Sequence, residues 1–169
     1  MNIKLNRFKL NNSGTTLIEI LIVMGLLSVM LVVIATIFTS SADVQKQSNS
    51  YSATISNGRF IMARLNYDIA HASSVITPST FGATNSSLEI VVGGNDYTYS
   101  LSGNNLQLTD NIGTDNLNSD DVHISGLSFQ EIGASGINPS IQYSFTATSV
   151  SHDAGNYDTQ TFTSSEDIR

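Results

Sequence analysis

The stretch TTLIEILIVMGLLSVMLVVIATIF, residues 15–38, decides the architecture of this chain of 169 residues. No charged residue occurs from Ile20 to Ala42, and a helix of ~20 mostly apolar residues is long enough to cross the hydrocarbon core of a bilayer. The sequence therefore predicts a membrane-spanning helix. Glu19 does not fit a plain anchor, because a carboxylate at the centre of such a helix costs ~2.5–3.5 kcal/mol on insertion scales and is by default a functional candidate.

Basic and acidic residues are segregated along the chain. Lys4, Arg7 and Lys9 precede the apolar stretch, and no acid occurs before Glu19. By the positive-inside rule this predicts a cytoplasmic N-terminus and an exported C-terminal domain. From Asp43 onward, four basic residues stand against thirteen acidic ones. Because nucleic-acid affinity rests on clustered Lys and Arg, no direct nucleic-acid site is expected. The chain has no cysteine, which excludes disulfides and thiolate metal sites.

Three interpretations of the apolar stretch compete. A secretory signal has an apolar core of ~7–15 residues followed by a small-residue cleavage site; SSA before Asp43 fits such a site, but the apolar run is too long. A plain uncleaved anchor explains the length and the basic flank and leaves Glu19 unexplained, unless the carboxylate reaches the membrane interface. The third interpretation accounts for leader, glycine, glutamate and apolar length together.

The motif SGTTLIE, residues 13–19, resembles the processing signal of type IV prepilins and pseudopilins. The resemblance implies that Gly14 ends the leader, that Thr15 becomes the new N-terminus and that Glu19 is the fifth mature residue. It also implies that a membrane-embedded prepilin peptidase cuts after Gly14 on the cytoplasmic side and methylates the new amine. Thr15 departs from the family, which usually has Phe or Met at this position, and the departure bears on methylation more than on cleavage.

The same resemblance implies a set of partners and a function. Glu19 would pair with the N-terminal amine of a neighbouring pilin subunit, which agrees with the high cost of an isolated buried charge. An assembly ATPase and an inner-membrane platform protein would move the helix from the lipid bilayer into a filament. The predicted function is therefore that of a structural subunit, not an enzyme. The alternative is a membrane-anchored adhesion or binding module, DNA capture included, that enters no filament.

The apolar periodicity continues beyond the membrane stretch. Tyr51, Ile55, Gly58, Met62, Leu65, Ile69 and Ala72 follow one another at intervals of three or four residues. This spacing predicts a one-sided stripe on an amphipathic helix that packs against its own sheet. A two-stranded coiled coil is the alternative. Because the residue before a proline disfavours helical geometry, Pro78 ends the predicted helix, which covers residues 43–77.

The remainder, residues 78–169, changes to the period of two that is typical of β-strands. Strands are predicted at 88–92, 97–101, 106–108, 122–131 and 140–150, and TQTFTS, residues 159–164, is a possible edge strand. GGND and SGNN have the Gly and Asn content of tight hairpins. The expected fold is α+β, with a leader at 1–14, a transmembrane and filament-core helix at 15–42, its amphipathic continuation, and an antiparallel sheet. This order is similar to minor pilins and minor pseudopilins of the J/W type.

A calcium site is the one cofactor candidate in the sequence. Asp110, Asp115, Asp120 and Asp121 lie in the run TDNIGTDNLNSDD, and Ca²⁺ binds six to eight oxygens from carboxylates, carbonyls and amides. The spacing does not match a D-x-[DN]-x-[DN]-G loop, so solvated turns are the alternative. The three histidines are far apart, and no nucleophile motif of the G-x-S-x-G kind occurs. Otherwise no cofactor is expected.

Overall fold

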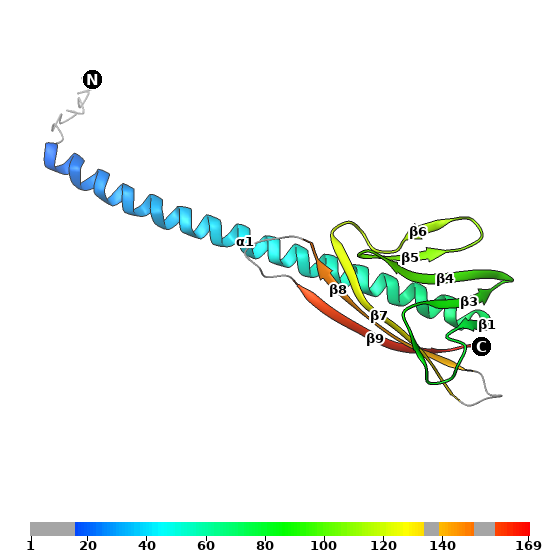
Figure 1. The fold of residues 1–169 in the computed structure, drawn as a ribbon. Coiled ribbons are helices and arrows are strands. Elements are labelled where there is room, and N and C mark those ends of the chain that lie inside the picture. The colour runs from blue at the N-terminus through cyan, green and yellow to red at the C-terminus, as the bar shows by residue number, and fades with distance from the viewer. Residues whose placement is uncertain (1–15, 134–138, 151–157) are drawn as a thin grey trace, which may run out of the picture. The chain divides into compact units, whose positions relative to one another are not determined.

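The computed structural model describes residues 16–133, 139–150 and 158–169. The chain divides into two compact units, Met1–Ala42 and Asp43–Arg169. One long helix, α1 (Leu17–Ala70), begins in the first unit and supplies the helical part of the second (Figure 1). The remaining elements, all strands, belong to the second unit.

The helix ends earlier than the sequence predicts. Residues 71–77 were expected to continue it, but α1 stops at Ala70 and β1 (Ala72–Thr77) follows after one turn residue. The segment ASSVIT consists mainly of Ser and β-branched residues, which lose side-chain freedom in a helix or compete with its backbone hydrogen bonds. Pairing with a neighbouring strand satisfies their backbone groups instead. The prediction of a helix over 43–77 is therefore wrong for its last seven residues.

The strands form two antiparallel sheets, where the sequence predicted one. The first sheet has the order β1-β3-β4-β5-β6. Its further strands are β3 (Leu88–Val92), β4 (Asn95–Ser102), β5 (Asn105–Thr109) and β6 (Thr114–Asn116). Gly93 and Gly94, with φ of 58° and 83°, make the tight turn between β3 and β4, and Gly103, with φ of 61°, lies in the next turn. The predicted Gly/Asn hairpins are confirmed.

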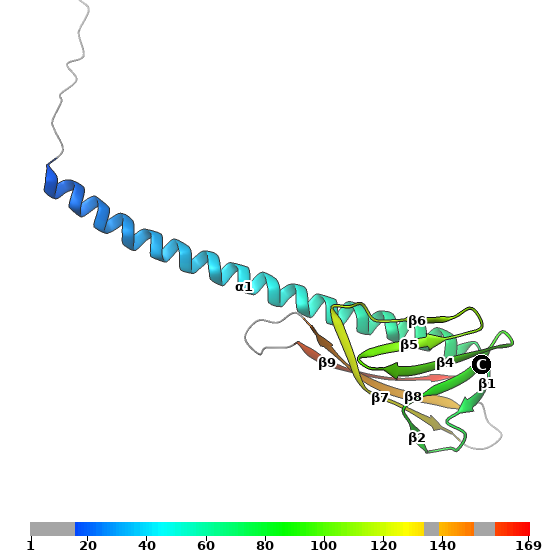
Figure 2. The same ribbon diagram turned by 45° about the horizontal axis from the view of Figure 1, so that its top comes forward.

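The second sheet has the order β2-β7-β8-β9. Its strands are β2 (Thr84–Asn85), β7 (Val122–Ile132), β8 (Ser140–Ser149) and β9 (Thr159–Asp167). The pairing of β7 with β8 shifts between Ser125 and Ser128, where Gly126 adopts a positive φ of 61°. The strands predicted at 122–131 and 140–150 are confirmed, and TQTFTS lies in an edge strand. Figure 2 shows both sheets of the second unit beside the final turns of α1.

A single hydrophobic core joins the last turns of α1 to both sheets. Its members are buried apolar side chains from the helix, from the first sheet and from the second, among them Ile61, Leu65, Tyr99, Phe129 and Phe145. The α+β prediction, a helix packed on antiparallel strands, is confirmed.

The helix face that packs on the core differs in part from the predicted stripe. Ser50, Thr54, Gly58, Ile61, Leu65, Asp68 and Ile69 are buried. Tyr51 was predicted to face the sheet, yet it is 50 % exposed. Polar side chains at 50, 54 and 68 take part in the buried face because they are small or hydrogen-bonded, which a count of apolar residues does not detect.

Candidate functional site: the exposed apolar helix and Glu19

The first part of α1 presents apolar side chains to its surroundings on every side. From Leu17 to Phe38 the large apolar residues are between 48 and 78 % exposed. This is the one helix, among the described residues, that is long and apolar enough to cross a membrane. Leaving one such side chain in water instead of burying it costs about 1.5–3 kcal/mol. The apolar segment (residues 17–42) therefore requires a lipid or protein partner.

Three hydroxyl groups inside the apolar segment donate hydrogen bonds to carbonyls of the helix itself. Ser28 donates to the carbonyl of Gly25 at 2.8 Å, and Thr36 donates to that of Val32 at 2.9 Å. Thr39 donates to the carbonyl of Thr36, also at 2.9 Å. Since a polar group in hydrocarbon is costly when it lacks a partner, these three side chains suit an apolar environment.

Glu19 occupies the first turn of α1. The carbonyl of Thr16 accepts hydrogen bonds from the amides of Glu19 at 3.0 Å and Ile20 at 3.3 Å. Thr16 is thus the N-cap, and Glu19, three residues later, has the T-x-x-E spacing of a capping box. A carboxylate here also interacts favourably with the positive end of the helix dipole. The position gives Glu19 a local role at the helix start, and its side chain is exposed to a partner.

Two of the predicted processing residues, Gly14 and Thr15, lie outside the described residues. The described chain begins at Thr16, the second residue after the predicted cut. Of the predicted motif, the structure therefore describes the N-cap, the glutamate and the apolar helix that follows.

The four candidate calcium ligands are placed in three different ways. Asp110 Oδ1 accepts hydrogen bonds from the amides of Ile112 at 2.8 Å and Gly113 at 3.0 Å, so this carboxylate closes a turn. Asp115 lies in β6, and Asp120 and Asp121 lie in the turn before β7. Within the described part of the chain, no three His, Cys, Asp or Glu side chains gather as a metal site would require. The calcium hypothesis stays untested, and the described residues offer no group of side chains that would bind the ion together.

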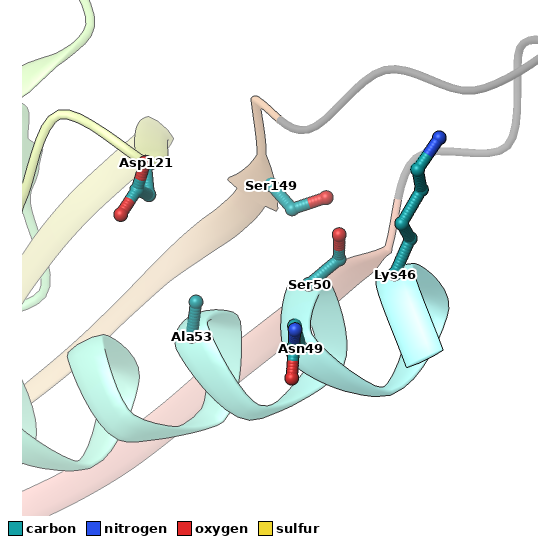
Figure 3. Close-up of a pocket in the computed structure, with 6 residues that line it drawn as sticks. All are labelled: Lys46, Asn49, Ser50, Ala53, Asp121 and Ser149. Atoms are coloured by element: carbon teal, nitrogen blue, oxygen red, sulfur yellow. The ribbon is translucent and has the colours of Figure 1, made fainter. Parts of the chain in front are cut away.

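A cavity of about 230 Å³ in the second unit was not predicted from the sequence. Figure 3 shows its lining: Lys46, Asn49, Ser50, Ala53, Asp121 and Ser149. The Ser149 hydroxyl is buried and has no hydrogen-bond partner among the described residues. A cavity with a few polar groups of this kind suits a bridging water. No sequence pattern predicts this cavity, because its lining residues come from three distant parts of the chain.

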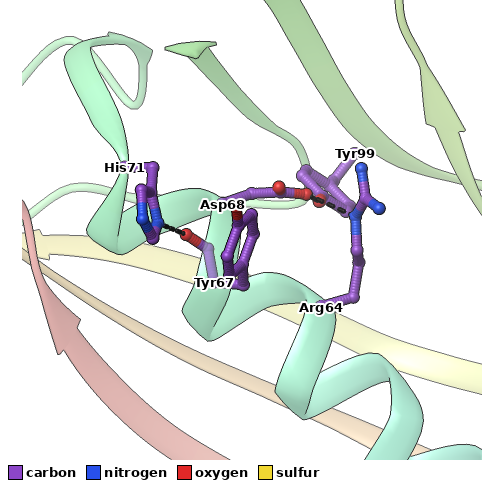
Figure 4. Close-up of polar contacts among 5 residues, drawn as sticks. All are labelled: Arg64, Tyr67, Asp68, His71 and Tyr99. Atoms are coloured by element: carbon purple, nitrogen blue, oxygen red, sulfur yellow. Dashed lines mark hydrogen bonds and ion pairs between the residues drawn. The ribbon is translucent and has the colours of Figure 1, made fainter. Parts of the chain in front are cut away.

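A buried polar cluster ties α1 to the first sheet (Figure 4). Arg64 Nε donates to Asp68 Oδ2 at 2.7 Å, and the Tyr99 hydroxyl donates to the same oxygen. Asp68 is 1 % exposed and Tyr99 is fully buried. Burial, together with the bond to Asp68, raises the pKa of Tyr99 well above its usual range. The cluster keeps a buried carboxylate paired, which is a structural role.

Among the described residues, neither His71 nor His123 makes a hydrogen bond to this polar cluster or to the other histidine. His71 stacks on Tyr67 with ring centroids 4.2 Å apart, and His71 Nδ1 lies 2.7 Å from the Tyr67 carbonyl oxygen. His123 is exposed on β7, and His152 lies outside the described residues.

Comparison of the chain with protein-family models, with curated proteins and with solved structures finds no match. The functional argument therefore rests on the residues and their geometry.

Proposed function

We propose that this chain is the precursor of a structural subunit of a type IV pilus-like filament, with a minor pilin or pseudopilin role. The observation that carries the proposal is the lone carboxylate of Glu19 in the first turn of a mostly apolar, exposed helical segment. A simple anchor needs the apolar length and gains nothing from the charge. A helix that moves from lipid into a bundle of like helices can use the charge to select its partner.

The proposed sequence of events begins with cleavage. Prepilin peptidase cuts after Gly14 on the cytoplasmic side, and Thr15 acquires a free amine one residue before the N-cap. In sequence that cation directly precedes the N-cap Thr16, and a positive charge near the N-terminus of a helix is unfavourable. Glu19 of a neighbouring subunit supplies the compensating charge during packing. The platform protein and its ATPase then lift the apolar segment out of the bilayer, while the acidic second unit stays on the exported side.

Cleavage is the first test. Co-expression of the full chain with a prepilin peptidase, followed by N-terminal sequencing, is expected to yield Thr15. The matched variant Gly14→Val should accumulate as uncut precursor in the membrane. An intact Met1 in the presence of active peptidase, or a mature start at Asp43, would exclude the filament precursor and favour an anchor or a secretory signal.

The second test separates the charge of Glu19 from its position at the helix start. Glu19→Gln retains the capping-box geometry, since Gln serves equally at this position, but it removes the charge. We expect normal cleavage and a large loss of incorporation into sheared filaments for Glu19→Gln. Glu19→Asp, which keeps a carboxylate, should recover part of the loss. Equal incorporation of Glu19→Gln and wild type would show that the carboxylate recruits no partner.

A further inference from the structure

The two sheets end in four edges, and one of them is unlike the rest. Of the described strands, β1 and β6 flank the first sheet, and β2 and β9 flank the second. β6 has three residues, β2 has two, and the pairing of β1 contains two register irregularities. β9 has nine residues and pairs with β8 without a register shift. Short or bulged edges are protected against further pairing, and a long regular edge is open to it.

The outward-facing backbone groups of β9 follow from its hydrogen bonds at both ends. The Asp158 carbonyl accepts from the Ser149 amide at 2.9 Å, and the Ile168 amide donates to the Pro139 carbonyl at 3.1 Å. Since alternate residues of an antiparallel strand direct both backbone groups to the same neighbour, even-numbered residues of β9 bond to β8. The odd-numbered residues, from Thr159 to Asp167, direct their N–H and C=O groups away from the sheet.

The side chains of the same odd-numbered residues are exposed and suit a partner strand. They are Thr159, Thr161, Thr163, Ser165 and Asp167. The strand contains no Lys or Pro, the residues that commonly protect an edge, and its acids, Glu166 and Asp167, lie at one end. The Asp167 carboxylate accepts a hydrogen bond from Ser140 on the neighbouring strand.

We propose that β9 pairs antiparallel with β9 of a second copy of this chain, about a two-fold axis at Thr163. In this register Thr161 lies opposite Ser165 of the second copy, and Thr159 lies opposite Asp167. The charge distribution favours this arrangement, because the acids of one strand face uncharged residues of the other. Parallel pairing in register would instead place Glu166 and Asp167 beside their own copies, and like charges on adjacent strands are destabilising.

This pairing goes beyond the proposed filament function and does not depend on it. A two-fold contact uses the same surface on both copies and closes at two chains. It requires neither cleavage after Gly14 nor the charge of Glu19. Its failure would leave the filament proposal intact, and failure of the filament proposal would leave the pairing intact.

Cysteine cross-linking of the full chain in detergent micelles tests the register, since the chain contains no natural cysteine. Thr163→Cys should form a disulfide-linked dimer, because opposed strand residues lie within disulfide reach. The matched control is Thr114→Cys, an exposed threonine on the three-residue edge strand β6. We expect at least about tenfold more dimer from Thr163→Cys, since a held pair reacts at a millimolar effective concentration. Equal yields from the two variants would overturn the proposal.

Two further sets of variants sharpen the result. Thr161→Cys and Ser165→Cys should each form little homodimer and should form a disulfide when mixed, as the antiparallel register requires.

Thr163→Lys and Thr163→Asp should each lower dimerisation, because two like charges meet at the axis, and an equimolar mixture should restore it. Two outcomes would contradict the pairing. One is unchanged dimerisation in Thr163→Lys and Thr163→Asp. The other is a yield of disulfide-linked dimer from Thr161→Cys alone that equals the yield from the mixture with Ser165→Cys.

Discussion

Gly58 lies where α1 packs against the ring of Phe162 on β9. A Cβ added at this position would meet the Phe162 ring at 2.1 Å. We expect Gly58→Ala to lower the free energy of unfolding by about 1–3 kcal/mol, as is usual for overpacking, although alanine recovers up to about 1 kcal/mol in helix propensity. Chemical denaturation of the full chain in detergent measures the change.

The control for this prediction is on the same helix. Ser56 is exposed, and Ser56→Ala should alter stability little. Combining Gly58→Ala with Phe162→Leu should recover part of the loss, because the smaller side chain makes room for the methyl group. Additive effects of the two substitutions would contradict a direct clash.

Glu131 provides a pH-dependent prediction. Its side chain lies on β7 and is buried, and burial raises the pKa of its carboxyl. An acid with a raised folded-state pKa binds its proton more tightly in the folded protein. Its favourable contribution is therefore complete below the unfolded-state pKa of about 4.3 and is lost as pH rises through the folded value.

The matching substitution is Glu131→Gln, which removes the titration and keeps the shape. We expect a higher Tm than wild type at pH 7 and no difference near pH 3.5, measured by thermal unfolding across this range. A difference in Tm that is constant with pH would show that the substitution acts through packing or hydrogen bonding and not through ionisation.

Among single residues, the sequence identifies the candidate Glu19 and part of the core, and it misses the buried polar cluster. Glu19 is identifiable because one charge interrupts an apolar run, a signal confined to a few neighbouring residues. Asp68 and Tyr99 are 31 positions apart, and no local pattern pairs them. Asp68 also carries a charge, which removes it from any apolar stripe, yet its pairing with Arg64 and Tyr99 allows it to be buried.

Among the elements, those with a sustained period were predicted and the short ones were not. The strand segments of β3, β4, β5, β7 and β8 alternate over five or more residues, whereas β2 and β6 have two and three residues and no measurable period. The short strand β2 depends on long-range pairing with β7, whereas β6 pairs with its neighbour in sequence, β5. The division into two sheets also depends on pairing between distant segments. The end of α1 was misplaced because Ala72 continues the helical spacing into a strand.

The β5–β6 turn provides a prediction at the scale of the element. Asp110 Oδ1 accepts both the Ile112 and the Gly113 amide. Asp110→Ala should speed hydrogen exchange of these amides, with a loss of about 1 kcal/mol per bond, while Asp110→Asn retains an acceptor and should show a smaller effect. Adding Ca²⁺ and then EDTA should leave exchange in the wild type unchanged if the turn rests on Asp110 alone. Slower exchange with Ca²⁺ that EDTA reverses would support the calcium hypothesis.

For the whole molecule, the division into two units separates the apolar segment from the hydrophobic core. All described buried side chains lie between Ser50 and Ile168, inside the second unit. The apolar segment contributes none of them, so the described core of the second unit does not depend on it. A domain with its own core is expected to fold alone.

This separation predicts the behaviour of a fragment that begins at Asp43. We expect residues 43–169 to be soluble without detergent and to unfold cooperatively, with a Tm close to that of the full chain in micelles.

A fragment of residues 71–169 is the matched control, because it removes Ile61, Leu65 and Ile69 from the core. Losing three fully buried side chains, each worth about 2–5 kcal/mol, exceeds much of the stability of a typical domain. Circular dichroism and near-ultraviolet signals should show the shorter fragment unfolded. Cooperative unfolding of the shorter fragment, or aggregation of both, would show that the second unit is organised differently from the core described above.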